Sequence, residues 1–379
     1  MTRAFRQAPR FLFCVTAFIP LLLSGCGEGN EAVSQAADSW VGSTPENART
    51  GAEPFPGSPD EPRLRNLRQL THGGTNAEAY FSPDGNRLVF QATWPGVSEC
   101  DQIYVMDLDG SNLERISTGE GRTTCGYFIP GRDEILFSST HHVDAMCPTP
   151  PDRTRGYLWG LFDYDVFVRD LGTGEVRQLT DTPGYDAEAT LSPDGSTIVF
   201  TSIRSGDLEI WAMDADGSNP RRLTDQVGYE GGAFFSPDGS RIVFRAHYPQ
   251  TEEELEEYVS LRDDGLIQGG RLEIYVMDAD GSNRVQVTDN GASNFAPFFH
   301  PDGERIIFSS NLHAPGGRSF DLYMIGVDGT GLERITKNEG FDGFPMFSPD
   351  GRHLVFASSR GAQAPGEINV FLAEWVESP

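Results

Sequence analysis

The chain has 379 residues and carries 29 basic and 56 acidic side chains, which gives a formal net charge of −27. An acidic surface of this strength repels nucleic acid and anionic lipid, so neither is an expected partner. Cations and basic proteins suit such a surface better.

The first 26 residues have the pattern of a secretory signal. Three arginines precede an apolar run from Phe11 to Leu23, and a Leu-Ser-Gly-Cys sequence ends the run at Cys26. A basic start, a short apolar stretch and a small-residue exit are typical of a signal peptide and too short for a spanning helix. The ending resembles a bacterial lipobox, which implies a signal peptide over residues 1–25 and a lipid on Cys26. An ordinary signal peptide with a chance cysteine is the alternative.

Residues 26–65 are rich in Gly, Ser, Pro, Ala, Glu and Asp and contain few large apolar side chains. Such a segment buries too little surface to offset the entropy of ordering, so we expect a flexible lipidated tether. Gly27, where an inner-membrane retention signal would have Asp, favours an extracytoplasmic place at the outer membrane, on its periplasmic or surface side.

Residues 66–376 contain a sixfold repeat. Each copy has a Pro-Asp-Gly turn or a worn version of it, with prolines at 83, 130, 193, 237, 301 and 349. Each copy holds four short β-rich runs separated by turns, the pattern of a four-stranded antiparallel blade with strands a, b, c and d. The sequence therefore predicts an all-β fold, a six-bladed β-propeller.

The ring is expected to close through its first strand. A d-like run at residues 68–71 precedes the first strand a, and the last copy ends with a c-like run at residues 368–372. The N-terminal strand should therefore pair onto the last blade, which removes an exposed edge.

The repeated Phe-Ser-Pro-Asp-Gly and Ile-Tyr-Val-Met-Asp-Xaa-Asp-Gly-Ser-Asn units resemble the WD-repeat-like propeller of the TolB family, over about residues 67–375. The resemblance implies the same propeller fold. TolB has an α/β domain ahead of its propeller, and we expect the lipidated tether to take that place here.

One face of the propeller is predicted to bind. The a–b and c–d turns share one face and are short, whereas the d–a and b–c loops share the other, here called the b–c face. The two longest insertions, residues 140–162 and 245–271, both belong to the b–c face. Long loops on one side of a rigid scaffold commonly carry binding. In the second insertion, Thr251 and Glu254 form a capping box, and Leu255, Tyr258 and Val259 form an apolar stripe, which predicts a short helix.

Six oxygen-bearing side chains are expected around the channel mouth on this face, here called the mouth ring. Each lies seven residues before a repeat proline: Asn76, Thr123, Asp186, Glu230, Asn294 and Asp342. Glu78 and Glu188 follow two residues later. The set suits Ca²⁺, another divalent cation or an amine-bearing ligand. Hydrogen bonding of these side chains to the d–a turns is the alternative.

Four histidines follow a strand b and so should share the b–c face: His141, His142, His247 and His313. Imidazoles there could coordinate a transition metal or act as acid–base groups, and loop packing is the alternative. In an oxidising compartment, a Cys100–Cys125 disulfide is the simplest pairing and Cys125–Cys147 is the alternative.

These features favour a monomeric envelope-anchored binding or scaffold module that engages a protein segment or small ligand. The competing hypothesis is an enzyme, a metal-dependent propeller lyase or hydrolase. No catalytic constellation in the sequence has diagnostic spacing, so binding is preferred.

Overall fold

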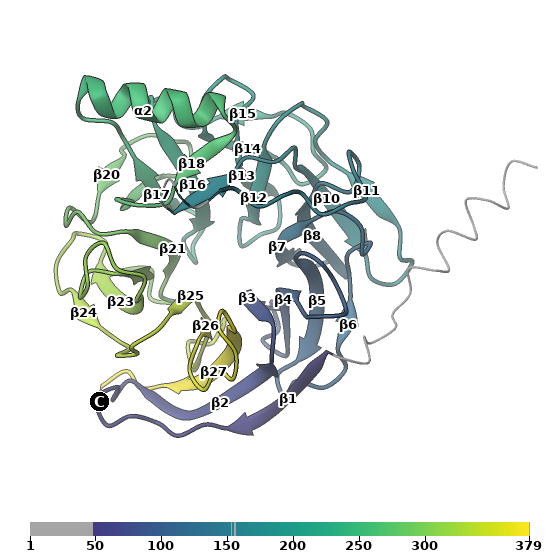
Figure 1. Ribbon diagram of the computed structural model, residues 1–379, viewed down its shortest axis with the longest axis vertical. Coiled ribbons are helices and arrows are strands. Elements are labelled where there is room, and N and C mark those ends of the chain that lie inside the picture. The colour runs from purple at the N-terminus through teal and green to yellow at the C-terminus, as the bar shows by residue number, and fades with distance from the viewer. Residues whose placement is uncertain (1–47, 153, 155–156, 379) are drawn as a thin grey trace, which may run out of the picture. The chain divides into compact units, whose positions relative to one another are not determined.

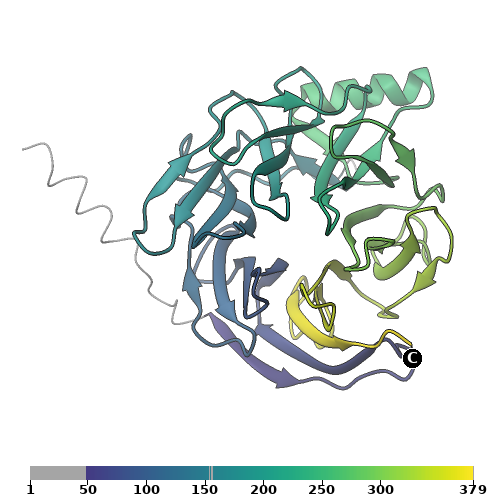
Figure 2. The ribbon, with the colours of Figure 1, turned by 180° about the vertical axis from the view of Figure 1, so that it is seen from behind.

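Six antiparallel blades surround a common axis in the computed structural model (Figure 1), as the repeats predicted. The structure describes residues 48–152, 154 and 157–378, and the predicted signal peptide and Cys26 lie outside them. Figure 2 shows the same ring from behind. Within each blade the strands pair in the order a, b, c, d, since consecutive strands are joined by short turns.

Blades 1 to 5 have the following strands in chain order. Blade 1 comprises β3 (Thr75–Phe81), β4 (Arg87–Thr93), β5 (Gln102–Asp107) and β6 (Glu114–Arg115). Blade 2 comprises β7 (Thr123–Phe128), β8 (Glu134–Ser139), β10 (Asp165–Asp170) and β11 (Val176–Gln178), and blade 3 comprises β12 (Asp186–Leu191), β13 (Thr197–Ser202), β14 (Glu209–Asp214) and β15 (Arg221–Arg222). Blade 4 comprises β16 (Tyr229–Phe235), β17 (Arg241–His247), β19 (Glu273–Asp278) and β20 (Val285–Gln286), and blade 5 comprises β21 (Asn294–Phe299), β22 (Arg305–Ser310), β23 (Asp321–Gly326) and β24 (Glu333–Arg334).

Blade 6 joins the two ends of the propeller. Its first three strands are β25 (Asp342–Phe347), β26 (His353–Ser358) and β27 (Asn369–Trp375), and its fourth is the N-terminal β2 (Leu64–His72). Gln69 pairs with Phe371 across the β2–β27 ladder. The predicted closure by the N-terminal strand is therefore confirmed.

The prediction that the tether extends to residue 65 is wrong for its last part. Strand β1 (Arg49–Pro54) pairs with β2 as a fifth strand of blade 6. The ring of Phe55 meets that of Phe371 edge-on, with centroids 5.1 Å apart. Glu61 is 2 % exposed and accepts hydrogen bonds from both terminal nitrogens of Arg360, at 2.6 and 2.7 Å. Composition alone does not predict that residues 49–61 are ordered, because the contacts that order them are made with residues of blade 6.

Turn chemistry explains why the repeat signature recurs. In blade 1 the Ser82 hydroxyl donates to Asp84 at 2.6 Å and accepts from the Arg87 amide at 2.9 Å. Gly85 has a φ of 72°, a left-handed conformation that glycine adopts at little cost. The same hydroxyl–carboxylate bond recurs at the turns of blades 3, 4 and 6. These turns fix the register of strands a and b.

The hydrophobic core lies between the blades. Strand b carries its most buried side chains, as in blade 1, where Leu88, Val89 and Phe90 have no exposed surface. Both faces of each inner strand pack against a neighbouring blade, which is why these runs are continuously apolar rather than alternating.

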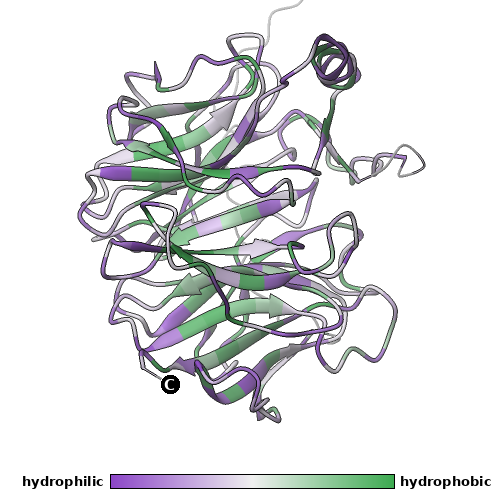
Figure 3. Cartoon of the chain, turned by 90° about the vertical axis from the view of Figure 1, so that its left-hand side faces the viewer, coloured by the Kyte–Doolittle hydropathy of each residue, from purple (hydrophilic) through white to green (hydrophobic). Residues whose placement is uncertain are grey.

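The insertion of blade 4 contains helix α2 (Glu252–Asp263), as the capping box predicted. Thr251 is the N-cap and accepts from the Glu254 amide, while the Glu254 carboxylate accepts from the Gln250 amide at 2.8 Å. The predicted apolar stripe needs correction, because Leu255 is exposed and the buried side chains are Tyr258 and Leu261. Figure 3 shows α2 standing to one side of the blades with a hydrophilic surface. No helix among the described residues has the length and apolar character that a membrane crossing requires.

We predict that Glu61→Ala lowers the free energy of unfolding by about 2–3 kcal/mol, because it removes one partner of the buried Arg360. Urea unfolding at pH 7 measures this loss. Glu53→Ala in β1, whose side chain is 74 % exposed, is the matched control and should change stability by less than about 0.5 kcal/mol. Equal small effects of both changes would contradict the packing of residues 48–63 on blade 6.

Candidate functional site

The mouth ring links strands within and between blades. Asn76, Thr123, Asp186, Glu230, Asn294 and Asp342 are all buried. Four of them bond a serine at the end of strand b in their own blade: Thr123 with Ser139, Asp186 with Ser202, Asn294 with Ser310 and Asp342 with Ser358. Three of the six ring residues form ion pairs with arginines. Arg204 donates to Asp186, Arg284 to Glu230 and Arg360 to Asp342. The structure thus supplies the ring with protein partners, and its role in ligand binding stays a prediction.

The channel itself is lined by side chains two residues further along each strand a. Every one of these residues has a left-handed backbone, with φ between 49° and 61°, in a β-bulge. The six are Glu78, Cys125, Glu188, Gly232, Ala296 and Phe344. Five of them are not glycine, so each carries a backbone cost of order 1 kcal/mol. The polar residues of this set, Glu78, Cys125 and Glu188, come from blades 1, 2 and 3.

Arg245 is the cation of the channel, and Gly232 makes room for it. Its guanidinium forms an ion pair with Glu188 and donates to the Tyr229 hydroxyl at 2.7 Å. A Cβ on Gly232 would lie 1.9 Å from Nη1 of Arg245. Only 9 % of the Arg245 side chain is exposed, so Glu188 compensates a charge that is largely removed from water.

Glu78 is the acidic group that Arg245 leaves without an ion pair. Burial raises the pKa of its carboxyl to about 7, the Cys125 hydrogen bond partly offsets this, and the negative charge of Glu188 raises it further. Burial also raises the pKa of the Cys125 thiol, and both carboxylates add to that rise. Near pH 7 the pair therefore holds a mixture of neutral and ionised carboxyl beside a neutral thiol.

Aromatic side chains close the far end of the channel. Tyr80 of blade 1 contacts both Tyr127 of blade 2 and Phe234 of blade 4, with ring centroids 5.8 and 5.6 Å apart. Phe234 also contacts Phe298 of blade 5 at 5.4 Å. Because Tyr80 and Phe234 meet across the axis, these rings close the channel on the side of the a–b turns, and the part that remains toward the b–c face is here called the funnel.

The insertions of blades 2 and 4 meet on the b–c face. Strand β9 (Leu158–Gly160) of the first pairs with β18 (Leu266–Gln268) of the second. The Trp159 ring lies 6.0 Å from that of Tyr229, and the Arg245 guanidinium is 5.1 Å from the Trp159 centroid. This two-stranded sheet, here called the cap, therefore contacts the Arg245 guanidinium of the channel through Trp159.

The histidines do not gather at one point. His141 packs on Phe167 and shares a hydrogen bond with Ser139, and burial lowers its pKa to about 4. His142 bonds Asp165 at 2.8 Å and His313 bonds Asp321 at 3.3 Å, in blades 2 and 5. His247 of blade 4 bonds the Arg271 carbonyl. In residues 48–152, 154 and 157–378, no group of three or more His, Cys, Asp or Glu is placed to hold a metal ion.

The predicted Cys100–Cys125 disulfide is wrong, as is its alternative. Cys100 is bonded to Cys147, and Cys125 is free. The start of the blade 2 insertion passes the b–c loop of blade 1, whereas strand β7 carries Cys125 into the channel. The bond therefore ties the cap-bearing insertion to blade 1.

Sequence reasoning missed Arg245, Trp159 and the aromatic closure. Counting five residues back from each repeat proline, rather than seven, finds the whole channel-lining set in the sequence. Arg245 had one signal, the glycine pair Gly231-Gly232 on the neighbouring strand. Trp159 had none, because its place depends on the pairing of two distant insertions.

We predict that Glu78→Gln stabilises the protein at pH 8 but not at pH 4.5. A folded-state pKa of about 7, raised from 4.5, means that the native state loses stability as pH rises through this interval. The gain at pH 8 is at most about 3 kcal/mol. Melting temperatures at both pH values measure it.

Asp84→Asn is the control of opposite sign. The Ser82 hydroxyl lowers the pKa of Asp84, so this change should destabilise the protein at pH 8. If the Glu78→Gln variant had the melting temperature of the wild type at both pH values, the Glu78 carboxyl would be solvated and the prediction wrong.

Comparison with known proteins agrees with this architecture. A family model described as "TolB beta propeller domain" matches residues 162–257 and 270–365. The Tol-Pal system protein TolB of Gluconobacter oxydans (strain 621H) is 27% identical over 137 residues, which are 36% of this chain and 25% of that protein. The uncharacterized peptidase YuxL of Bacillus subtilis (strain 168) is 28% identical over 240 residues, 61% of this chain and 29% of that protein. The chain thus matches less than a third of the length of either relative.

The solved structure of a putative TolB from Agrobacterium tumefaciens has a TM-score of 0.54 and 19% identity, covering 87% of this chain and 99% of that one. This likeness concerns the fold alone. The family model matches half of the sequence, in two stretches that contain four of the six repeat prolines. The chain belongs to the TolB β-propeller family.

Proposed function

We propose that this chain is an envelope-anchored, extracytoplasmic binding module that engages a segment of an envelope protein on its b–c face. The observation that carries the proposal is the union of two insertions, from blades 2 and 4, on that face. The a–b and c–d turns of the other face are short and repetitive. A scaffold elaborated on one side alone is the arrangement that binding proteins use.

The chemistry of the b–c face favours a basic segment. The funnel contains the carboxyls of Glu78 and Glu188 with Arg245 as its cation, and the whole chain has a formal net charge of −27. Electrostatic attraction to such a surface speeds the encounter with a positively charged partner. The aromatic floor made by Tyr80 and Phe234 sets the depth to which a side chain can enter.

Site-specific crosslinking in cells tests the binding face. We predict that a photoreactive residue at Tyr157, which is 48 % exposed on the blade 2 insertion, crosslinks to an envelope protein. The matched position is Glu304, 73 % exposed beside the a–b turn of blade 5, which should give no such product. Equal crosslinking from both positions would contradict a single binding face.

The anchor is a separate part of the proposal and rests on the lipobox-like sequence at Cys26. Cys26→Ser removes the sulfur that would carry the lipid, and we predict that the protein then moves from the membrane fraction to the soluble fraction. Cell fractionation measures the distribution, with Cys125→Ser as the matched loss of one thiol. A Cys26→Ser protein that stays in the membrane fraction would contradict lipid anchoring.

A further inference from the structure

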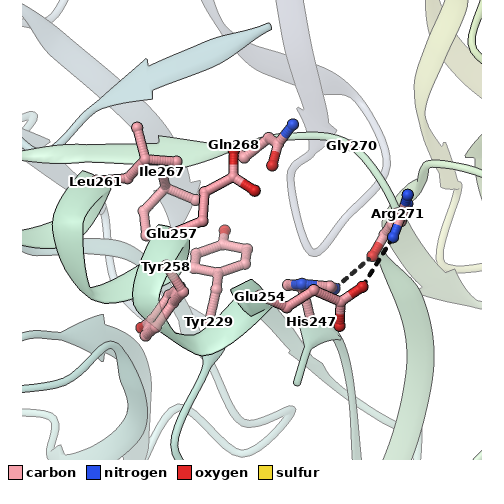
Figure 4. A pocket seen from close by; sticks show the side chains of 10 residues that line it. All are labelled: Tyr229, His247, Glu254, Glu257, Tyr258, Leu261, Ile267, Gln268, Gly270 and Arg271. Carbon is pink, nitrogen blue, oxygen red and sulfur yellow. Dashed lines mark hydrogen bonds and ion pairs between the residues drawn. The ribbon is translucent and has the colours of Figure 1, made fainter. Parts of the chain in front are cut away.

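A cavity of about 240 Å³ lies between helix α2, the end of β17 and strand β18 (Figure 4). A cavity needs about 10–15 Å³ of such volume to hold one water molecule, so this one can hold considerably more. It is smaller than the roughly 300 Å³ typical of the smallest drug-sized pockets. The cavity therefore has room for one short chain or side chain. Its lining comes from the blade 4 insertion and from Tyr229 and His247 of the repeated strands β16 and β17.

The inner walls of this cavity are apolar and fixed. Tyr229 forms its base, and Tyr258, Leu261 and Ile267 complete the walls. All four side chains are buried. The Tyr258 hydroxyl lies within hydrogen-bonding distance of the Asp207 carboxylate and the Gly228 carbonyl, and by donating its one proton to either it holds α2 over the cavity. These contacts give the cavity a rigid shape and an aromatic surface.

Several polar groups at the cavity are already bonded to one another. Glu254 accepts from Arg271 at 2.9 Å, so this pair contributes no net charge. Nδ1 of His247 lies 3.1 Å from the Arg271 carbonyl and must donate to it, because a carbonyl can only accept. Burial lowers the pKa of His247, so the ring is neutral at pH 7 and its Nε2 is an acceptor.

Two polar side chains have no such partner. Among the residues that the structure describes, the side chains of Glu257 and Gln268 make no hydrogen bond or ion pair, and both line the cavity. In Figure 4 the Glu257 carboxylate and the Gln268 amide lie on the same side of the cavity, above the ring of Tyr229. The uncommitted charge at the cavity is therefore negative. It adjoins the Tyr229 ring, whose centroid lies 5.6 Å from the Arg245 guanidinium, a cation that is already paired with Glu188.

We infer that this cavity binds an alkylammonium group, with Glu257 as its counter-ion and the Tyr229 ring as the surface under its charged end. A carboxylate and an aromatic face together attract an organic cation, while the apolar walls take up its methylene chain. An anion is disfavoured for two reasons. The Arg271 guanidinium is already paired with Glu254, and the Glu257 carboxylate would repel the anion.

Two sources supply such a group, a free small amine and the lysine side chain of a polypeptide. This inference does not rest on the proposed function, because it concerns the residues that line the cavity under α2, among them Glu257 and Tyr229. A protein without an envelope partner could still bind an amine here.

Titration of the purified protein with pentylamine, followed by ligand-observed NMR, tests the inference. We expect saturable binding, with 1-pentanol at least about fivefold weaker because it lacks the charge. Glu257→Gln should weaken pentylamine about fivefold. Glu256→Gln, which makes the same charge change on the neighbouring exposed residue of α2, should leave the affinity within about twofold. N-acetyl-lysine methylamide binding more tightly than pentylamine would identify a polypeptide as the source, and equal affinity a free amine.

Arg271→Gln gives a test of opposite sign. It frees the Glu254 carboxylate and removes a like charge, so pentylamine should bind severalfold more tightly. The inference is overturned if pentanol binds as well as pentylamine, if Glu256→Gln and Glu257→Gln weaken binding equally, or if Arg271→Gln abolishes it. Both glutamates are exposed, so these variants should keep the wild-type melting temperature.

Discussion

The pairing of β2 with β27 is the constraint on which the rest of the propeller depends. It joins residues about 300 positions apart in the chain and covers the outer edge of β27 in blade 6. Once the ring is closed, six strands a converge on one axis, and side chains from blades 1 to 4 can meet there. Strand β1 and Glu61 reinforce this closure from outside, since Glu61 holds Arg360 of blade 6, which in turn holds Asp342 of the mouth ring.

The converging strands exclude water from the axis, where a charged side chain is costly to bury, and yet charged side chains lie there. Arg245 and Glu188 are largely removed from water, a state that is stable only because they face each other. Glu78 has no ion-pair partner among the described residues, and burial raises the pKa of its carboxyl. A propeller stabilised by burial alone would have apolar side chains at these positions, as Ala296 and Phe344 are on the opposite side. The asymmetry gives the funnel a polar half, contributed by blades 1 to 4, and an apolar half, contributed by blades 5 and 6.

The insertions extend this asymmetry to the b–c face. The Cys100–Cys147 disulfide holds the insertion of blade 2 to blade 1, and the β9–β18 ladder joins it to the insertion of blade 4. Trp159 connects the cap to Arg245, so the cap and the funnel are in direct contact. The cavity under α2 shares Tyr229 with both. One face of the molecule thus carries adjoining features that differ in chemistry, while the other face carries the short repeated turns.

The sequence by itself determined the number of blades, the closing strand, the face that carries the insertions and the start of α2. These follow from local rules, because a Ser-Pro-Asp-Gly turn or a capping box is satisfied within a few residues. Only the tertiary structure decided that residues 49–54 form strand β1 and that Cys100 is bonded to Cys147. It also decided the position of Trp159 and the ion pair between Glu188 and Arg245. Each of these depends on atoms from segments that lie far apart in the chain. No local pattern encodes such contacts, since their energy arises only when the closed ring and the paired insertions remove both partners from water.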